Sequence, residues 1–497
     1  MTDTASPDLA DSAIPPVPAT AADGSTDAVA DPPYRLRWIV FVAVLVADVM
    51  DLVDATVMNV AGPTIRAELG GGQSMLQWLG AGYTLTFATF LITGARLGDL
   101  FGRRRLFLIG AAGFTSSSLL CALAWSPEVL IGTRALQGGF GALMIPQGFG
   151  MLTEVLKGKD MEKGFAVFGP VMGLSAIAGP IIGATLLEAD VFGTGWRAIF
   201  IINLPLGIFA FIAGARTMPT SVAAKGGGLD LPGMGLVGLA MFLLIFPLIE
   251  GHERDWPAWV FALMAAGVVV GALFVARLRR TPVDRALIRL SLLGNAAFSS
   301  GMLVAAGFFA AFAGMALVLG LFWQVGEGDS PTEAAVALIP MTLGMVLGMI
   351  GGFALVEKLG RKLIQVGIAL AALGLVILAA TVQGKDEISA WSAVPGTVLM
   401  GMGAGFVFGQ LFDVILASVD EVEVGSASGL LNALQQFGNA LGVAVVGTVF
   451  FNVLDVPHLP TDALAVTALA CLVPLAISFV LAFRLPQRAR EGGPAAH

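Results

Sequence analysis

Three aspartates lie within one of the most apolar segments of the chain, VADVMDLVDATVMNV (residues 46–60). Asp48, Asp51 and Asp54 are three residues apart, and each such step advances about 300° around a helix. They therefore share one sector of about 120°, and Asn59 lies near the azimuth of Asp48. A carboxylate that faces lipid costs at least about 2.5 kcal/mol, so we expect this sector to face a bundle interior or a watery cavity. Burial and mutual repulsion both favour protonated carboxyl groups, which suggests a sector that binds and releases protons.

Arg134, in RALQGGFGALMIP (residues 134–146), is the other charge inside an apolar stretch. A buried arginine needs a carboxylate or several carbonyl groups, so a pair between Arg134 and an aspartate of the first span is the simplest solution. Protonation of the aspartate would weaken this pair and bias the choice between two conformations. The alternative is structural: Asp48 or Asp51 hydrogen-bonds a neighbouring helix or reaches the cytoplasmic vestibule.

Two further stretches combine unusual residues with apolar surroundings. Asp413, in FGQLFDVILASV (residues 408–419), lies about a turn from the cytoplasmic end of its span, so a structural and a functional role both stay open. GLSAIAGPIIGA (residues 173–184) places Pro180 among small residues. Proline kinks a span and small residues allow close helix approach, so packing alone accounts for this stretch.

The composition indicates that a lipid bilayer surrounds most of the chain. Hydrophobic residues make up 57% and charged residues 12% of the 497 residues, whereas a soluble domain carries about twice that share of charge. Apolar windows long enough to cross a hydrocarbon core of about 30 Å predict an all-α polytopic membrane protein. The fourteen predicted spans lie near residues 38–60, 75–97, 106–125, 129–151, 164–187, 198–215, 231–249, 257–276, 297–323, 332–355, 363–382, 393–417, 428–451 and 463–484.

Basic residues predict the orientation of these spans. An even number of spans places both termini on one side, which is expected to be cytoplasmic because its short loops hold most lysines and arginines. These residues are Arg103, Arg104, Arg105, Lys157, Lys159, Lys163, Arg277, Arg279, Arg280, Arg285, Arg289, Lys358, Arg361, Lys362, Arg484, Arg488 and Arg490. Residues 1–33 contain no lysine or arginine and are expected to form a disordered tail before an uncleaved signal anchor.

A weak internal repeat predicts two halves of six spans each. The turn GDLFGRRR (residues 98–105) after the second span has a degenerate echo, VEKLGRKL (residues 356–363), after the tenth. Transporters built from parallel repeats carry such turns at equivalent points. We expect a tail over 1–33, a six-helix bundle over 34–217, a linking helix pair over 218–285, a second six-helix bundle over 286–485 and a tail over 486–497.

Other chemistries have little support in the sequence. No GxxxxGK[ST] loop occurs, which argues against an ATP-driven pump on this chain, and no HExxH or CxxC motif is present. GMGAGFVFG (residues 401–409) lies within a span with no strand before it, so a dinucleotide loop is not expected. Cys121 and Cys471 fall inside spans and are expected to be small buried residues. We expect no metal site, no organic cofactor and no nucleic-acid partner.

Several motifs together resemble one family, the fourteen-helix drug:proton antiporters of the major facilitator superfamily. The resemblance covers nearly the whole chain after residue 34, with six motifs in the expected order. Three departures occur, each at a usual glycine: Ala95, Phe140 and Ala184. The similar stretches are DATVMNVAGP (residues 54–63), RLGDLFGRRR (96–105), RALQGGFGA (134–142), AGPIIGA (178–184), GWRAIFIINLPLG (195–207) and GSASGLLNALQQFGNALG (425–442).

The resemblance implies roles for individual residues. It singles out Asp54 for proton handling, with Asp51 and Asp48 as further candidates, and it makes Arg134 the residue that senses their charge. A substrate cavity is expected between the halves near the midplane, lined by spans 1, 4, 5, 9 and 12. Further candidates are Asp99, Gly102, Arg103 and Arg104 for a cytoplasmic latch, Gly179, Pro180 and Gly183 for the antiporter motif at the gating interface, and Asn59, Gln137 and Asp413 for the substrate cavity.

These features predict a monomeric transporter of the plasma membrane, with protons as the coupling ion. Inward proton flow would drive the export of lipophilic compounds by alternating access, and the acids of the first span favour cationic ones. Export of a neutral or anionic metabolite, antibiotic or lipid by the same coupling stays open. A membrane-embedded enzyme would need a nucleophile or a metal set within the spans, and a scaffold or receptor would not need three acids there. We therefore expect no enzymatic activity.

Overall fold

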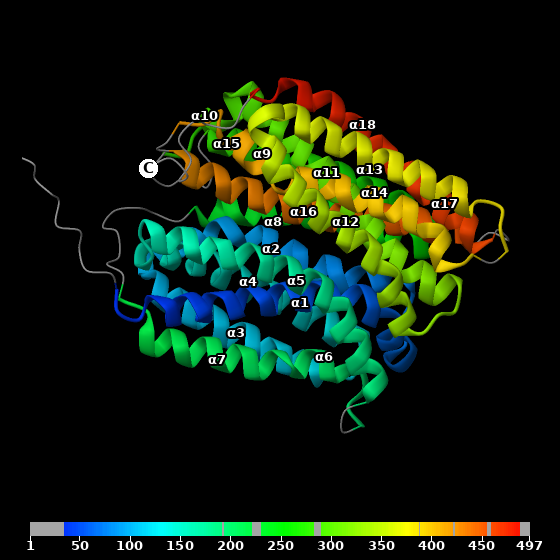
Figure 1. Cartoon of the computed structure of the whole chain (residues 1–497), viewed down its shortest axis with the longest axis horizontal. Helices are drawn as coiled ribbons and strands as arrows, with labels where there is room; N and C mark the ends of the chain where they lie inside the picture. Colours follow the sequence, from blue (N-terminus) through cyan, green and yellow to red (C-terminus); the bar gives the residue numbers. More distant parts are fainter. Residues whose placement is uncertain are drawn as a thin grey trace, which may run out of the picture.

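A computed structural model describes residues 34–190, 193–220, 230–282, 290–386, 388–420, 423–454 and 459–487. Helices make up the regular structure of these ranges, and most run along the long axis of the molecule (Figure 1). The two predicted tails fall largely outside the described residues. So do most of the glycine-rich stretch before residue 230 and the basic residues Arg285, Arg289, Arg488 and Arg490.

Helices α1 to α7 pack together as the N-terminal half. α1 packs against α5 and α7, and α4 packs against both α2 and α3. The sixth predicted span of this half, over residues 198–215, is broken after Ile201 into two helices. The ring of Pro205 would clash with the carbonyl group of Ile201, four residues earlier. The helices are α1 (Arg37–Leu69), α2 (Gln73–Phe101), α3 (Arg103–Ala122), α4 (Pro127–Val155), α5 (Lys159–Ala189), α6 (Ala198–Ile201) and α7 (Asn203–Thr217).

Helices α10 to α18 form the C-terminal half. α14 packs against α12 and α13, and α11 packs against α16 and α18. Its last segment is also broken by proline, since α17 ends at Ala470, four residues before Pro474. The helices are α10 (Leu290–Gly294), α11 (Ala296–Leu321), α12 (Pro331–Leu359), α13 (Arg361–Val382), α14 (Ala390–Phe408), α15 (Leu411–Leu416), α16 (Val424–Leu454), α17 (Pro460–Ala470) and α18 (Leu472–Leu481).

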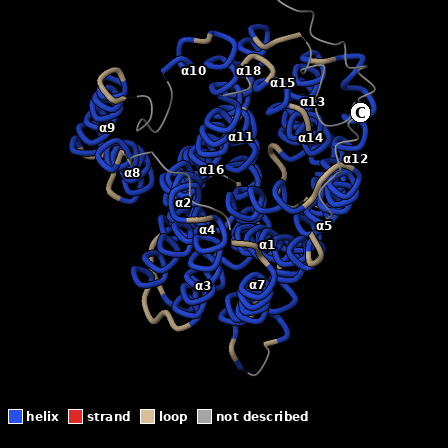
Figure 2. Tube along the Cα trace, turned by 90° about the vertical axis from the view of Figure 1, so that its left-hand side faces the viewer, coloured by secondary structure: helices blue, strands red, loops and turns tan. Residues whose placement is uncertain are grey.

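The linking pair, α8 (Leu231–Glu253) and α9 (Ala258–Leu278), stands beside the two halves (Figure 2). α8 contacts α2 of one half and α16 of the other. At one end, Arg277 of α9 donates hydrogen bonds of 2.8 and 3.1 Å to the buried carboxylate of Asp230, the residue that caps α8. At the other end, Trp78 Nε1 of α2 donates to Glu250 Oε1 at 2.9 Å. The pair is therefore anchored to both halves rather than free.

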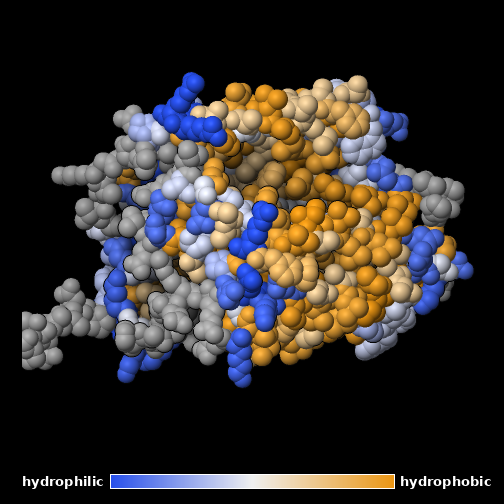
Figure 3. Space-filling view, turned by 90° about the horizontal axis from the view of Figure 1, so that it is seen from above, coloured by the Kyte–Doolittle hydropathy of each residue, from blue (hydrophilic) through white to orange (hydrophobic). Residues whose placement is uncertain are grey.

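The outer surface is that of a multi-pass membrane protein. Hydrophobic side chains cover the middle of the molecule, and hydrophilic side chains gather toward its ends (Figure 3). Val268 of α9 and Ile350 of α12 are 65% and 64% exposed, and many other large apolar side chains on this surface are also exposed. Contiguous apolar surface of this extent requires lipid as its solvent.

Twelve helical segments in the described ranges are long and apolar enough to cross a membrane. They coincide with twelve of the fourteen predicted windows. The windows at 38–60 and 129–151 are also helical, in α1 and α4, and both helices carry charged side chains among their apolar residues. α1 carries the three aspartates, and α4 carries Arg134 with the buried Gln137 and Gln147. Both helices have the length of a span, 33 and 29 residues.

The predicted internal repeat is visible in the two equivalent turns. Gly102 and Gly360 each separate two helices and adopt φ values of +93° and +51°, a region that favours glycine. After each glycine, an arginine binds backbone carbonyl groups at the end of the last helix of its own half. Arg104 reaches α7, and Arg361 donates hydrogen bonds of 2.8 and 2.9 Å to carbonyl groups just beyond α18. The two halves thus use the same device to fix their third helix to their sixth.

Gly401, Gly403 and Gly405 of GMGAGFVFG lie on α14 and allow close packing on two sides. A Cβ atom on Gly401 or Gly405 would overlap backbone carbonyl oxygens of α12, whereas one on Gly403 would overlap the backbone of α13. These positions are therefore packing glycines, and they lie within a span, as the sequence predicts.

Replacing Gly405 by alanine is expected to lower the apparent melting temperature of the purified protein, because the new Cβ would overlap the Met345 carbonyl oxygen. Overpacking of this kind typically costs about 1–3 kcal/mol. Gly132→Ala on α4 is the matched control, because a Cβ there meets open space and alanine restricts the unfolded chain, which stabilises by up to about 1 kcal/mol. Equal thermal shifts for the two variants would contradict the close α12–α14 contact.

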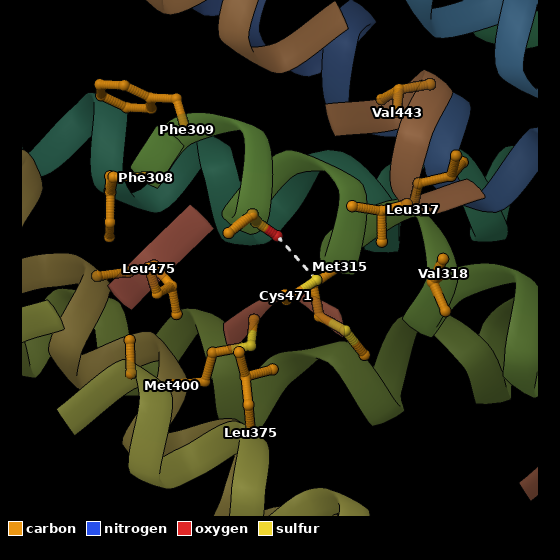
Figure 4. Close-up of a cluster of buried hydrophobic side chains, with 14 of the residues drawn as sticks. Phe308, Phe309, Met315, Leu317, Val318, Leu375, Met400, Val443, Cys471 and Leu475 are labelled. Carbon is orange, nitrogen blue, oxygen red and sulfur yellow. Dashed lines mark hydrogen bonds between the residues drawn. The ribbon is translucent and has the colours of Figure 1, made fainter. Parts of the chain in front are cut away.

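The interior of the C-terminal half is densely apolar (Figure 4). Met315 of α11 and Met400 of α14 lie near Cys471, and the Cys471 Sγ atom lies 3.9 Å from the carbonyl oxygen of Ala311. Cys471 and Cys121 are both free and buried. The prediction that both are small buried residues is confirmed.

Candidate functional site

A cavity of ≈ 1010 Å³ lies between the two halves. This volume is at the upper end of the range for pockets that enclose drug-sized ligands. α1, α2 and α4 supply most of one wall, and α11, α12 and α16 supply most of the other, with single residues from α5 and α14. The predicted lining spans, which are α1, α4, α5, α11 and α14, all contribute. The prediction missed α2, α12 and α16.

The cavity is open at one end. Asp99 at the end of α2 and Thr153 at the end of α4 both line it and are exposed, so the cavity reaches the surface there. At the opposite end the lining residues Leu76 and Val443 are buried, with 3% and 9% exposure.

Contacts between the halves close that opposite end. Gln77 of α2, which is 2% exposed, donates hydrogen bonds to the Ala444 carbonyl oxygen at 3.2 Å and to Thr448 Oγ1 at 3.4 Å, both on α16. The backbone N–H of Thr332 on α12 donates to Glu188 Oε1 on α5 at 3.1 Å. Two separate pairs of helices, α2 with α16 and α5 with α12, thus join the halves at the closed end.

Asp51 is the aspartate of α1 that lines the cavity. Its carboxylate accepts a hydrogen bond from the hydroxyl of Tyr83 on α2. The Tyr83 side chain is itself 1% exposed and is held by ring contacts with Phe87 and Phe114. The guanidinium carbon of Arg134 lies 4.6 Å from the centre of the Tyr83 ring. Asp51 therefore joins the cavity to the charged interior of the N-terminal half.

Asp54, one turn farther along α1, is sealed inside that half with 2% exposure. Arg134 of α4 forms a hydrogen-bonded ion pair with it, so the predicted pair between Arg134 and an aspartate of the first span is present. Gln137 Nε2 and Asn203 Nδ2 also donate to the Asp54 carboxylate, at 3.0 and 2.7 Å. Arg134 Nε donates to the Leu79 carbonyl oxygen at 3.2 Å, which satisfies more of the guanidinium group. The buried charges are thus paired and hydrogen-bonded.

Gln137 belongs to this buried network, and its prediction as a cavity residue is wrong. Its side chain is fully buried, and its Nε2 also donates to Ser118 Oγ at 2.9 Å. Sequence reasoning missed Ser118, Asn203 and Tyr83. A polar residue inside an apolar span, such as Asn203 in FIINLPL, could have marked them as candidates. Nothing in the sequence, however, indicates which helices these residues face.

The remaining predicted polar residues lie in different places. Asn59 lines the cavity, as predicted. Asp48 is 4% exposed, and its Oδ2 atom has no hydrogen-bond partner within the part of the chain that the structure describes. Asp413 is exposed on the short helix α15 and is not among the residues that line the cavity, so its prediction as a cavity residue is wrong. A carboxylate near the end of its span reaches water more readily than the bundle interior.

The predicted cytoplasmic latch lies at the open end of the cavity. Arg103 Nη2 is 3.3 Å from Asp99 Oδ1, and Arg103 Nη1 donates to the Gly150 carbonyl oxygen on α4 at 2.8 Å. Asp99 and Arg103 both line the cavity mouth, and Gly102 between α2 and α3 is buried. These contacts hold α2, α3 and α4 together within one half. A role in gating stays a prediction.

The glycines of the antiporter motif pack α5 against α1. A Cβ atom on Gly179 would overlap the side chain of Thr56, and one on Gly183 would lie 2.9 Å from Val57 Cγ1. Pro180 between them lines the cavity. Gly179 thus faces a helix of its own half, because α1 and α5 approach too closely there for larger residues. A role of Gly179 with Pro180 in a gating interface stays a prediction.

Comparison with known proteins identifies the family. A sequence profile described as Major Facilitator Superfamily matches residues 44–443 of the chain. The chain belongs to the major facilitator superfamily. This superfamily member resembles the solved structure of a D-xylose-proton symporter with a TM-score of 0.64 at 15% identity, covering 90% of this chain and 98% of that one. It resembles an auto-inhibited peptide transporter of the POT family with a TM-score of 0.63 at 16% identity, covering 90% and 95%. At such identity the likeness shows the fold alone.

Other relatives share a higher sequence identity with this superfamily member than the two solved structures do. The chain is 46% identical over 447 residues to a probable actinorhodin transporter of Streptomyces coelicolor, covering 89% of this chain and 77% of that protein. It is 32% identical over 416 residues to a tetracenomycin C resistance and export protein of Streptomyces glaucescens, covering 82% and 75%. This major facilitator protein is a membrane transporter and not an enzyme. No group of three or more metal-ligating side chains is positioned to hold an ion within the described ranges.

Proposed function

We propose that this protein is a proton-coupled exporter of antibiotic-like small molecules, and that it works as a drug:proton antiporter by alternating access. The observation that carries the proposal is the arrangement of Asp51 on the cavity wall beside the buried Asp54–Arg134 pair. The names of the relatives, which refer to antibiotic transport, resistance and export, support the direction of transport.

We propose that Asp51 exchanges protons with the substrate cavity. Its carboxylate reaches the cavity, whereas Asp54 is enclosed by Arg134, Gln137 and Asn203. In an outward-open state Asp51 would bind a proton from outside. In the inward-open state it would release that proton to the cytoplasm as substrate enters, and the substrate then leaves on the other side. Antiport would follow because a bound substrate and a proton on Asp51 disfavour each other within the same cavity.

The Asp54–Arg134 pair would couple this exchange to the movement of helices. Arg134 contacts α1 through Asp54 and α2 through the Leu79 carbonyl group, and its guanidinium carbon lies 4.6 Å from the centre of the Tyr83 ring. A change of charge on Asp51 alters the field on Arg134 across a region of low dielectric constant. The relative positions of α1, α2 and α4 would respond, which biases the choice between the two states.

The proposed topology has fourteen spans with α1 and α4 included, and both termini in the cytoplasm. The mouth at Asp99 and Thr153 would then face the cytoplasm, next to the basic turn Arg103 to Arg105. The state described here would be inward-open and ready to take up substrate. We propose a single chain as the working unit, since one chain encloses the whole cavity.

A second candidate is the export of one endogenous antibiotic rather than of many unrelated drugs. The observation that favours it is the 46% identity to a protein named a probable actinorhodin transporter. The coupling mechanism would be the same, and only the breadth of substrates would differ.

Reconstituted protein tests the proposal. Liposomes with a pH-sensitive dye inside and an imposed pH gradient would receive a panel of lipophilic cations and neutral aromatic antibiotics. Proton movement triggered by compounds of the panel, and absent from protein-free liposomes, is expected. A broad response supports multidrug export, and a response to one chemical group supports the second candidate. Substrate transport that continues unchanged without a pH gradient or membrane potential would overturn proton coupling.

A further inference from the structure

The two walls of the cavity differ in charge. Among the described residues that line it, every charged one belongs to the N-terminal half: Asp51, Asp99, Arg103 and Arg134. The C-terminal half contributes apolar, hydroxyl and amide side chains. The groups that can exchange protons therefore lie on one wall. The other wall, which carries no charged side chain among the described lining residues, is available to bind the substrate.

Three phenylalanines form an aromatic surface on the uncharged wall. Phe309 and Phe312 of α11 and Phe408 of α14 all line the cavity. The Phe408 ring meets the Phe309 ring edge-to-face at 4.8 Å and the Phe312 ring at 5.3 Å. Figure 4 shows that Phe308, the neighbour of Phe309, projects in a different direction from α11. These contacts fix the half-buried rings of Phe312 and Phe408 as a rigid aromatic surface, which is backed by the buried ring of Phe309.

A row of amide side chains follows one face of α16 along the same wall. Asn432, Gln435, Gln436 and Asn439 line the cavity at helical spacing, and the row extends about 10 Å along the helix. Gln435 makes no hydrogen bond to the described residues, and Asn439 Nδ2 donates to Gln436 Oε1 at 2.7 Å. The row therefore offers free donors and free acceptors to the cavity. Hydroxyl and carbonyl oxygens of a ligand satisfy both kinds of group.

The carboxylate nearest to this wall gives little reason to prefer a cation. The Tyr83 hydroxyl already donates to Asp51, and the charge of Arg134 on the same wall is paired with Asp54. Among the described lining residues, the C-terminal wall itself has no charge that would pair with a cation. The aromatic surface also binds cations through their attraction to ring faces, so the two ligand classes need a direct test.

We propose that the C-terminal wall binds the exported substrate as a flat, uncharged aromatic molecule with hydroxyl or carbonyl groups along one edge. The rings of Phe312 and Phe408, supported from behind by Phe309, would contact its faces, and the amides Gln435 and Gln436 would hydrogen-bond its oxygens. This inference rests on the proposed export function and adds the substrate class and the residues that select it.

Binding to purified wild-type protein in detergent tests the inference without any proton gradient. The probes are 1,8-dihydroxyanthraquinone, the same ring system without hydroxyl groups (9,10-anthraquinone) and tetraphenylphosphonium, each measured by equilibrium dialysis. The wild type is expected to bind the dihydroxy compound most tightly. The double variant Gln435→Leu/Gln436→Leu should weaken binding of the dihydroxy compound by about tenfold and change the binding of anthraquinone less. Phe312→Ala should weaken the binding of both anthraquinones.

The matched control is Gln365→Leu, the same exchange on α13 at a position that does not line the cavity. It is expected to bind the dihydroxy compound like the wild type, and thermal stability measured on all variants verifies their folding. Tighter binding of tetraphenylphosphonium than of the dihydroxy compound, or no saturable binding of the latter, would overturn the inference. So would equal binding by the double variant and Gln365→Leu. Because dialysis involves no gradient, a failure of proton coupling in liposomes leaves these results unchanged.

Discussion

Arg134→Met protein should melt at a clearly lower temperature than the wild type and should not transport. The substitution leaves Asp54, which is 2% exposed, without its ion-pair partner, and it removes a group that also binds the Leu79 carbonyl oxygen. Removing one partner of a buried pair typically destabilises by about 3–5 kcal/mol because the remaining charge is uncompensated. Thermal unfolding of the purified protein, followed by transport in liposomes, measures both effects.

The double variant Arg134→Met/Asp54→Asn separates stability from coupling. It removes both charges together, and the amide introduced on α1 can still bond Gln137 and Asn203. We expect it to recover much of the lost stability, because a neutral pair avoids the unpaired buried charge. Transport should stay absent. Recovery of transport together with stability would show that the pair is only structural, and an undiminished melting temperature in the single variant would contradict the buried pair itself.

Asp51→Asn protein should bind substrate but lose substrate-driven proton movement. Asparagine has nearly the same shape and still accepts from the Tyr83 hydroxyl, so the cavity keeps its form, but asparagine cannot titrate. Because asparagine mimics the protonated carboxyl group, and proton release on binding requires that form to bind substrate more weakly, we expect the dissociation constant to rise by about tenfold while binding stays measurable. Proton flux in the liposome assay should fall to that of protein-free liposomes.

Asp413→Asn is the matched control for this prediction. The same exchange is made on an aspartate that is exposed on α15 and is not among the cavity residues. Its proton flux should equal that of the wild type. A large loss of proton flux in Asp413→Asn, together with normal proton flux in Asp51→Asn, would reverse the assignment of the two acids.

The helices could be predicted from the sequence because their signal is local. All fourteen apolar windows lie in helices, since a run of about twenty apolar residues has few alternatives in a bilayer. Prolines account for the breaks at Ile201 and Ala470, where the ring conflicts with a carbonyl group four residues earlier. A pair between Arg134 and one aspartate of the first span was also predictable, because each charge needs a partner that the apolar surroundings otherwise lack.

Which acid faces which environment was not predictable. Asp51 and Asp54 share a sector of α1, but their neighbours come from α2, α4 and α7, and only the packing of these helices places Tyr83 beside one and Arg134 beside the other. The predictions for Gln137 and Asp413 were wrong for the same reason, because the sequence does not indicate which neighbouring helices surround a residue. The amides of α16 lay in a stretch already noted for its resemblance to the family, yet their position on the cavity wall depends on contacts between the halves.

Proton release on ligand binding is the most direct test of the central claim, that Asp51 exchanges its proton for substrate. Purified protein in weakly buffered detergent solution would receive a compound that the wild type binds, and a pH indicator would follow the solution. The wild type should release protons on binding. Asp51→Asn should bind the same compound with no release. Equal proton release from Asp51→Asn and the wild type would contradict the account and move the exchange site to another carboxyl group.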